Sequence, residues 1–183
     1  MRLKMTVVLA ITALSLILGC ALSLTLSVQL LHQRSSQAYA TNSMIAHQVL
    51  FATATAIRRD IRRPNLGNPR ALRDEVAEAL RSDTALNTLM RQSVRYSPTT
   101  LDVTIADAEG PELDSTNYGT LDQRLPSRPE YAEFQRRGEL GLLRLAFGPP
   151  RVYEVTLPLE RNSEPFATVR VGFSASYLHS LSN

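Results

Sequence analysis

The chain has few of the residues that build disulfides, metal centres or catalytic sites. Its 183 residues include one cysteine and three histidines. A single cysteine excludes an intrachain disulfide, and the histidines are far apart in the sequence. No HExxH, GxSxG or paired-cysteine motif occurs. The sequence therefore predicts no catalytic residues, no metal and no cofactor, and we do not expect an enzyme.

Charge is missing from the stretch Met5–Leu31, which contains no Asp, Glu, Lys or Arg. At about 1.5 Å per residue this stretch makes a helix of roughly 40 Å, enough to cross a bilayer core of about 30 Å. A cleavable signal peptide has an apolar core of only about 7–15 residues, so we expect an uncleaved anchor. Gly19-Cys20 within it leaves lipoprotein processing open as an alternative, although the apolar pattern continues beyond this pair.

The flanking charges predict how the anchor is oriented. Arg2 and Lys4 precede it, whereas on the far side only Arg34 lies close. This bias places the N-terminus in the cytoplasm. We therefore expect a single-pass protein of the inner (cell) membrane, in which residues 1–32 form the cytoplasmic tip and transmembrane helix. Residues 33–183 then form one periplasmic or extracellular domain.

The balance of charge argues against nucleic acid as a partner. Outside the predicted anchor and tip, 18 basic residues nearly match 17 acidic ones. A nucleic-acid-binding domain would favour a basic stripe.

A helical pattern continues out of the membrane from Gln33 to Arg63. It has one apolar seam with a 4-3-4 spacing, formed by Ile45, Val49, Ala52 and Ala56. Two interpretations of the seam stay open: a contact through which two copies form a homodimer, or packing against the chain's own domain. Basic residues at the end of this helix complement the helix macrodipole.

Two one-sided helices and then strands are predicted to follow. The helices run over Pro69–Arg81 and from Asp83, a capping residue, to about Arg91. A short helix is expected at Pro129–Arg137 and a last one from Ser174. Alternating apolar residues predict strands at Leu101–Ala106, Glu112–Thr116, Leu142–Phe147, Val152–Leu159 and Phe166–Phe173. The expected fold class is α+β, an antiparallel sheet of about five strands with flanking helices.

The hairpins resemble those of a known family. Val103–Gly110 with Asp114–Thr116 is similar to the central hairpin of extracytoplasmic PAS-like sensor domains called Cache domains, and Tyr153–Leu159 with Ala167–Ser174 is similar to their terminal hairpin. These domains form the N-terminal portion of bacterial sensor histidine kinases and chemoreceptors. The resemblance implies a PAS-like sensory input domain of two-component signal transduction, which binds a small-molecule ligand and passes a helix shift toward the membrane. It also implies a cytoplasmic kinase or response regulator as a partner, since this chain contains no kinase module.

The resemblance places the ligand on one face of the sheet, under the loop from Asp114 to Tyr131. The residues expected to bind it are Arg128, Tyr131, Arg151, Tyr153 and Arg170. Because arginine binds a carboxylate through two parallel hydrogen bonds, the ligand is expected to be small and anionic. Each residue also has a structural interpretation, the strand arginines as surface ion partners and Tyr153 as part of the core.

Two other classes of protein stay open. A pseudopilin-like assembly subunit also joins an N-terminal apolar helix to a sheet domain. Such a subunit would require a Glu near the start of that helix, and Met5–Leu31 contains no acidic residue. An anchored periplasmic enzyme or lipoprotein would need a nucleophile motif, which the sequence lacks.

Overall fold

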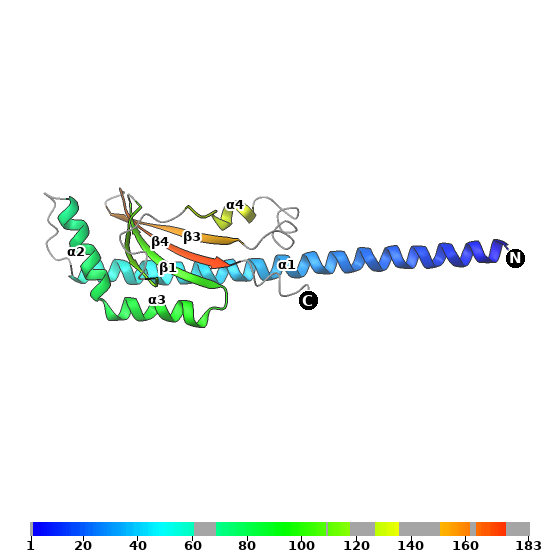
Figure 1. Ribbon diagram of the computed structural model, residues 1–183, viewed down its shortest axis with the longest axis horizontal. Helices are drawn as coiled ribbons and strands as arrows, with labels where there is room; N and C mark the ends of the chain where they lie inside the picture. Colours follow the sequence, from blue (N-terminus) through cyan, green and yellow to red (C-terminus); the bar gives the residue numbers. More distant parts are fainter. Residues whose placement is uncertain are drawn as a thin grey trace.

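The chain folds into a long N-terminal helix followed by a mixed domain of helices and strands (Figure 1). The computed structural model describes residues 2–60, 69–108, 110–117, 127–135, 151–161 and 164–174. Its elements are α1 (Arg2–Asp60), α2 (Pro69–Ser82), α3 (Thr84–Tyr96), β1 (Thr100–Asp107), β2 (Glu112–Ser115), α4 (Tyr131–Gln135), β3 (Val152–Arg161) and β4 (Glu164–Ser174). The α+β class is confirmed.

Within the described residues, the sheet has four antiparallel strands in the order β2-β1-β4-β3. The last strand, β4, therefore lies between β1 and β3. The expected fifth strand, Leu142–Phe147, and the last helix, expected from Ser174, lie outside the described residues. Beside β3, the Glu154 N–H donates to the carbonyl of Pro129 at 3.2 Å, and Glu130 forms a parallel bridge with Glu154.

Local signals in the sequence set the ends of several elements. The Asp83 side chain caps α3 as predicted, because its Oδ1 accepts from the backbone N–H groups of Ala85 and Leu86 at 2.9 and 3.1 Å. Arg59, in the last turn of α1, forms an ion pair with Asp83. This pair fastens the end of α1 to the start of α3.

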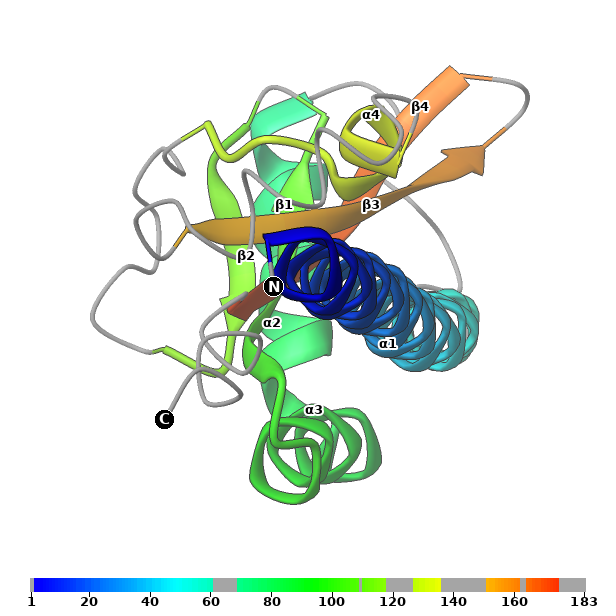
Figure 2. The same cartoon turned by 90° about the vertical axis from the view of Figure 1, so that its right-hand side faces the viewer.

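Three of the described helices cover one face of the sheet. α1 packs on β3 and β4, α3 on β1 and α2 on β2, and Figure 2 shows α1 and α3 side by side below the strands. The seam of α1 faces this core: Val49 and Ala56 are fully buried, Ile45 nearly so, and Ala52 packs against them. Of the two interpretations of the seam, the structure shows the intramolecular one, so these residues are not available to a second copy.

A buried polar contact holds α1 to the connection between α3 and β1. Asn42 is fully buried. Its Nδ2 donates to Ala38 O at 2.8 Å and to Thr99 Oγ1 at 3.1 Å, and Thr100 Oγ1 donates to its Oδ1 at 2.7 Å. An amide whose groups are all satisfied in this way fixes how far α1 is rotated and advanced along the sheet.

The N-terminal half of α1 projects away from the domain (Figure 1). Its large apolar side chains from Val7 to Leu30, apart from the half-buried Val28, are 51–71% exposed. A helix this apolar within a soluble core would be mostly buried, yet none of its most apolar window is buried. α1 is thus long and apolar enough to cross a membrane, and among the described residues it is the one helix that is.

Charging the seam should unfold the domain. We expect Val49→Asp to lower the free energy of unfolding by more than about 3 kcal/mol, because the new carboxylate would be buried without a partner. Gln48→Asp adds the same charge one residue away on an exposed position and should change stability little. Thermal melts of the full chain in detergent test this, and equal melting temperatures for the two variants would contradict the packing of the seam.

Candidate functional site

The face of the sheet turned away from the three helices is polar. Side chains alternate along a strand, so in β4 Val169, Val171 and Phe173 face the core while Arg170 and Gly172 face the other side. The register aligns these outward residues in rows across β1, β4 and β3. We call the following set the polar face: Asp102, Thr104, Glu112, Arg128, Glu154, Thr156, Arg170 and Gly172.

Arg128 and Asp102 form a bidentate ion pair on the polar face. Arg128 Nη1 and Nη2 donate to Asp102 Oδ1 and Oδ2, each at 2.7 Å, and both side chains are only about a quarter exposed. The hydrogen bond to Asp102 raises the pKa of the Arg128 guanidinium, so this group stays charged. The pair lies over Gly172, where any Cβ would overlap Arg128 Nη1 and Asp102 Oδ1.

Arg170 and Glu154 form a second ion pair beside the first. Arg170 Nη2 donates to Glu154 Oε1 and Oε2 at 2.7 and 2.6 Å, and its Nε donates to Oε2 at 3.1 Å. Glu112 is 1% exposed and lies in register with Ala106 on the same face of β1. The polar face thus gathers two guanidinium groups and three carboxylates away from bulk water.

The structure brings together two of the five residues predicted to bind ligand, Arg128 and Arg170. Tyr131 and Tyr153 lie on the opposite, core face, which corrects the expectation that they line the same site. Tyr131 is 1% exposed and stacks on Tyr39 of α1 at 5.4 Å between ring centroids, with Tyr153 and Phe173 edge-on at 5.7 and 5.2 Å. The bridge at Glu130 fixes this direction, because the next side chain along must point to the other face.

Arg151 stands apart from the polar face. It is exposed and lies one residue before β3.

Sequence reasoning missed the acidic partners and the glycine of the polar face. Asp102 and Glu154 each occupy an outward position of a strand, as Arg170 does. The signal was the opposite charge at outward positions of strands that pair, but it can be read only once the register is known.

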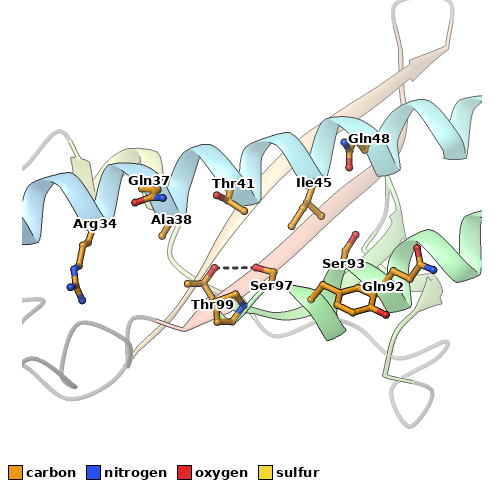
Figure 3. A pocket seen from close by; sticks show the side chains of 12 residues that line it. Arg34, Gln37, Ala38, Thr41, Ile45, Gln48, Gln92, Ser93, Ser97 and Thr99 are labelled. Atoms are coloured by element: carbon orange, nitrogen blue, oxygen red, sulfur yellow. Dashed lines mark hydrogen bonds between the residues drawn. The ribbon is translucent and has the colours of Figure 1, made fainter.

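A groove lies between α1 and α3, away from the polar face (Figure 3). Its volume is about 750 Å³. Glutamine, serine and threonine predominate among its described lining residues, of which Arg34 is the one charged residue. The lining residues are Arg34, Gln37, Ala38, Thr41, Ile45, Gln48, Gln92, Ser93, Tyr96, Ser97, Pro98 and Thr99. None of the residues predicted from the sequence to bind ligand lies in this groove.

Metal binding finds no support in the described residues, where no group of three or more His, Cys, Asp or Glu side chains is arranged to hold an ion.

Comparison with known proteins does not assign the chain to a family. No protein-family model matches the chain, and no curated protein is similar to it.

Asp114 of β2 is a buried acid whose pKa is raised above its ordinary value. It is fully buried; Oδ1 accepts from the Ser115 N–H at 2.9 Å, whereas Oδ2 has no hydrogen-bond donor among the described residues. Burial raises the pKa of Asp114, opposed by that hydrogen bond and by the charges of Arg81 and Arg91.

Substituting Asp114 should flatten the dependence of stability on pH. With its pKa raised in the folded state, Asp114 keeps its proton at pH values where the unfolded chain, with an aspartate pKa of about 3.9, has lost it. The free energy of unfolding therefore falls as pH rises above about 4. Asp114→Asn cannot ionise, so we expect it to be at least as stable as the wild type at pH 7.5, with a gain of about 1 kcal/mol.

Denaturant titrations between pH 4.5 and 7.5 measure this effect. Asp74→Asn, at an exposed position of α2, serves as the control. Lower stability of Asp114→Asn at pH 7.5 would mean that the attraction of Arg81 and Arg91 outweighs burial.

Gly172→Ala should destabilise the domain by about 1–3 kcal/mol, because the added methyl group overlaps the Arg128–Asp102 pair. The cost should shrink when Arg128→Ala is already present, since one of the two overlapping groups is gone. Gly19→Ala, where nothing lies within 4 Å of the new Cβ, is the control. Additive costs in a double-mutant cycle of unfolding free energies would show that the pair does not lie over Gly172.

Proposed function

We propose that the chain is a membrane-anchored sensory input domain, PAS-like and of the Cache type, that binds a small ligand on the polar face. α1 anchors it in the inner membrane with the N-terminus in the cytoplasm, and the domain stands on the outer side. The observation that carries the proposal is the placement of two bidentate arginine–carboxylate pairs, partly buried, on the sheet face opposite the core.

Partly buried charges support a binding role because they are costly to maintain. Taking a charged group out of water has a desolvation penalty that its partner offsets only with good geometry. Charges that serve solubility alone stay exposed, as Arg151 does.

The acidic partners modify the expected charge of the ligand. Asp102 and Glu154 already occupy the two guanidinium groups, and Glu112 adds a third carboxylate. The carboxylate of any ligand would have to displace Asp102 or Glu154 from its guanidinium group, and an amine on the same ligand would then pair with the displaced carboxylate. We therefore favour a small zwitterion over a plain anion.

β4 offers a direct path from ligand to membrane. Arg170 and Gly172 belong to the polar face, while Val169 and Val171 of the same strand face the core into which α1 packs. A displacement of β4 by a ligand would press on α1, and helix shifts of about 1–2 Å suffice for signalling. The receiving partner would be a cytoplasmic kinase or response regulator.

Titration calorimetry of the full chain in detergent against a panel of organic acids and amino acids tests the proposal. We expect at least one amino acid to bind, and Arg128→Gln to weaken that binding at least tenfold. Arg95→Ala, at an exposed position of α3, should leave the affinity unchanged. No binding across the panel, or equal affinity for Arg128→Gln in a chain that still melts cooperatively, would refute it.

A further inference from the structure

The groove between α1 and α3 is a hollow that the proposed ligand site does not use. Its volume of about 750 Å³ falls within the range of about 300–1,000 Å³ that is usual for small-molecule sites. Figure 3 shows Arg34 at one end of the groove and Gln48 at the other. These two residues lie about 21 Å apart along the helix, at 1.5 Å per residue. The groove therefore has room for a molecule much larger than a single ion.

One end of the groove lies at the predicted membrane surface. Arg34 lies about 4.5 Å along the helix beyond Leu31, the last residue of the uncharged stretch. The polar headgroup layer on each side of a bilayer is roughly 5–7 Å thick. If α1 crosses the membrane, it holds Arg34 at the level of the lipid phosphates.

α3 runs back toward the same end of the groove. Asp83, which caps its first turn, pairs with Arg59 at the far end of α1. Thr99, just after α3, accepts a hydrogen bond from Asn42, much closer to the membrane half of α1. The last residue of α3, Tyr96, is 73% exposed and lines the groove. A tyrosine with an exposed ring and hydroxyl is typical of the membrane–water interface.

The walls of the groove carry positive charge and no acid. Arg34 is the sole Asp, Glu, Lys or Arg of α1 between Gln33 and Ile57, and α3 contains Arg91 and Arg95 but no Asp or Glu. Among the described residues, no ion pair involves Arg34. The membrane end of the groove therefore offers a cation to a negatively charged ligand.

Beyond Arg34 the groove offers uncharged hydrogen-bonding groups. Gln37, Thr41, Gln48 and Gln92 line it, and their side chains form no hydrogen bond within the described part of the chain. Amides and hydroxyls both donate and accept hydrogen bonds, so they suit the hydroxyl groups of a ligand. Along α1 the order is thus one cation at the level of the phosphates, then neutral polar groups farther from the membrane.

We propose that the groove binds an anionic membrane lipid whose phosphate is followed by a hydroxyl-rich headgroup. Arg34 binds the phosphate through charge-assisted hydrogen bonds, and Gln37 binds hydroxyl groups of the headgroup. The proposal depends on the membrane anchor but not on the polar face. A failure to find a ligand for the polar face would leave it intact, so the two failures are distinguishable.

The reach of a headgroup distinguishes a lipid from a soluble ligand. Gln37 lies about 9 Å beyond Leu31 along the helix, whereas Gln48 lies about 25 Å beyond it. A lipid held in the bilayer by its acyl chains contacts the first glutamine and not the second. A free molecule of the same headgroup chemistry could reach both.

Lipid titrations of the full chain in a neutral detergent, read by native mass spectrometry, test the proposal. We expect phosphatidylinositol to bind about tenfold more tightly than phosphatidylcholine, and phosphatidic acid, which has the phosphate without the polyol, to lie between them. Arg34→Gln should remove the preference for both anionic lipids. Arg58→Gln makes the same change at another exposed position, about 36 Å farther along α1, and should preserve the preference. Equal affinity of the wild type for the three lipids, or equal losses in the two variants, would overturn the proposal.

Two glutamine variants and a soluble headgroup identify the source of the ligand. Gln37→Leu should weaken phosphatidylinositol several-fold and leave phosphatidic acid unchanged, whereas Gln48→Leu should change neither. Both positions are exposed, so both variants should keep the melting temperature of the wild type. Inositol phosphate without acyl chains should bind at least tenfold more weakly than the lipid. Equal losses for the two variants, or a free headgroup that binds as tightly as the lipid, would refute a membrane lipid as the occupant.

Discussion

The burial of one side of α1 against β3 and β4 is the constraint on which the rest of the structure depends. The helix presents small and apolar residues to the core, from Ala38 to Ala56, with Asn42 satisfied among them. The apolar contacts contribute the free energy of folding. The Asn42 amide determines the position of α1, because only one rotation of the helix lets both its N–H and its oxygen form their hydrogen bonds. The direction in which the membrane half of the helix leaves the domain follows from this packing.

With the helices on one side, the polar face has a different physical character from the core. The core face is close-packed and apolar, whereas the opposite face carries charges that depend on exact geometry. Gly172 shows the connection between the two: its neighbours Val171 and Phe173 fill the core, and its missing side chain makes room for the Arg128–Asp102 pair. One strand therefore satisfies two sets of steric demands at once.

Sequence patterns predicted those elements whose signals are local. The seam of α1, the cap at Asp83 and the alternation in β4 all follow from neighbours within a few residues. The order of the strands could not be predicted in this way, because the insertion of β4 between β1 and β3 is decided by contacts between distant segments. The same limit applies to the site. In the sequence, Asp102 looks like a solvated strand residue. Only the register, which pairs Asp102 with Gly172, shows that the Arg128–Asp102 ion pair lies over this glycine.

Arg128 links three strands of the sheet, which its sequence context does not reveal. The backbone next to it pairs with β3 through Pro129, yet its side chain crosses β4 to reach Asp102 on β1. The ion pair thus ties three strands together across the polar face. A ligand that takes over either half of this pair changes the contact between β4 and its neighbours, and it can shift the protein only by as much free energy as it gains from that exchange. Because β4 also belongs to the sheet surface on which α1 packs, a change in the polar contacts on one face of β4 would alter the packing of α1 on the other face.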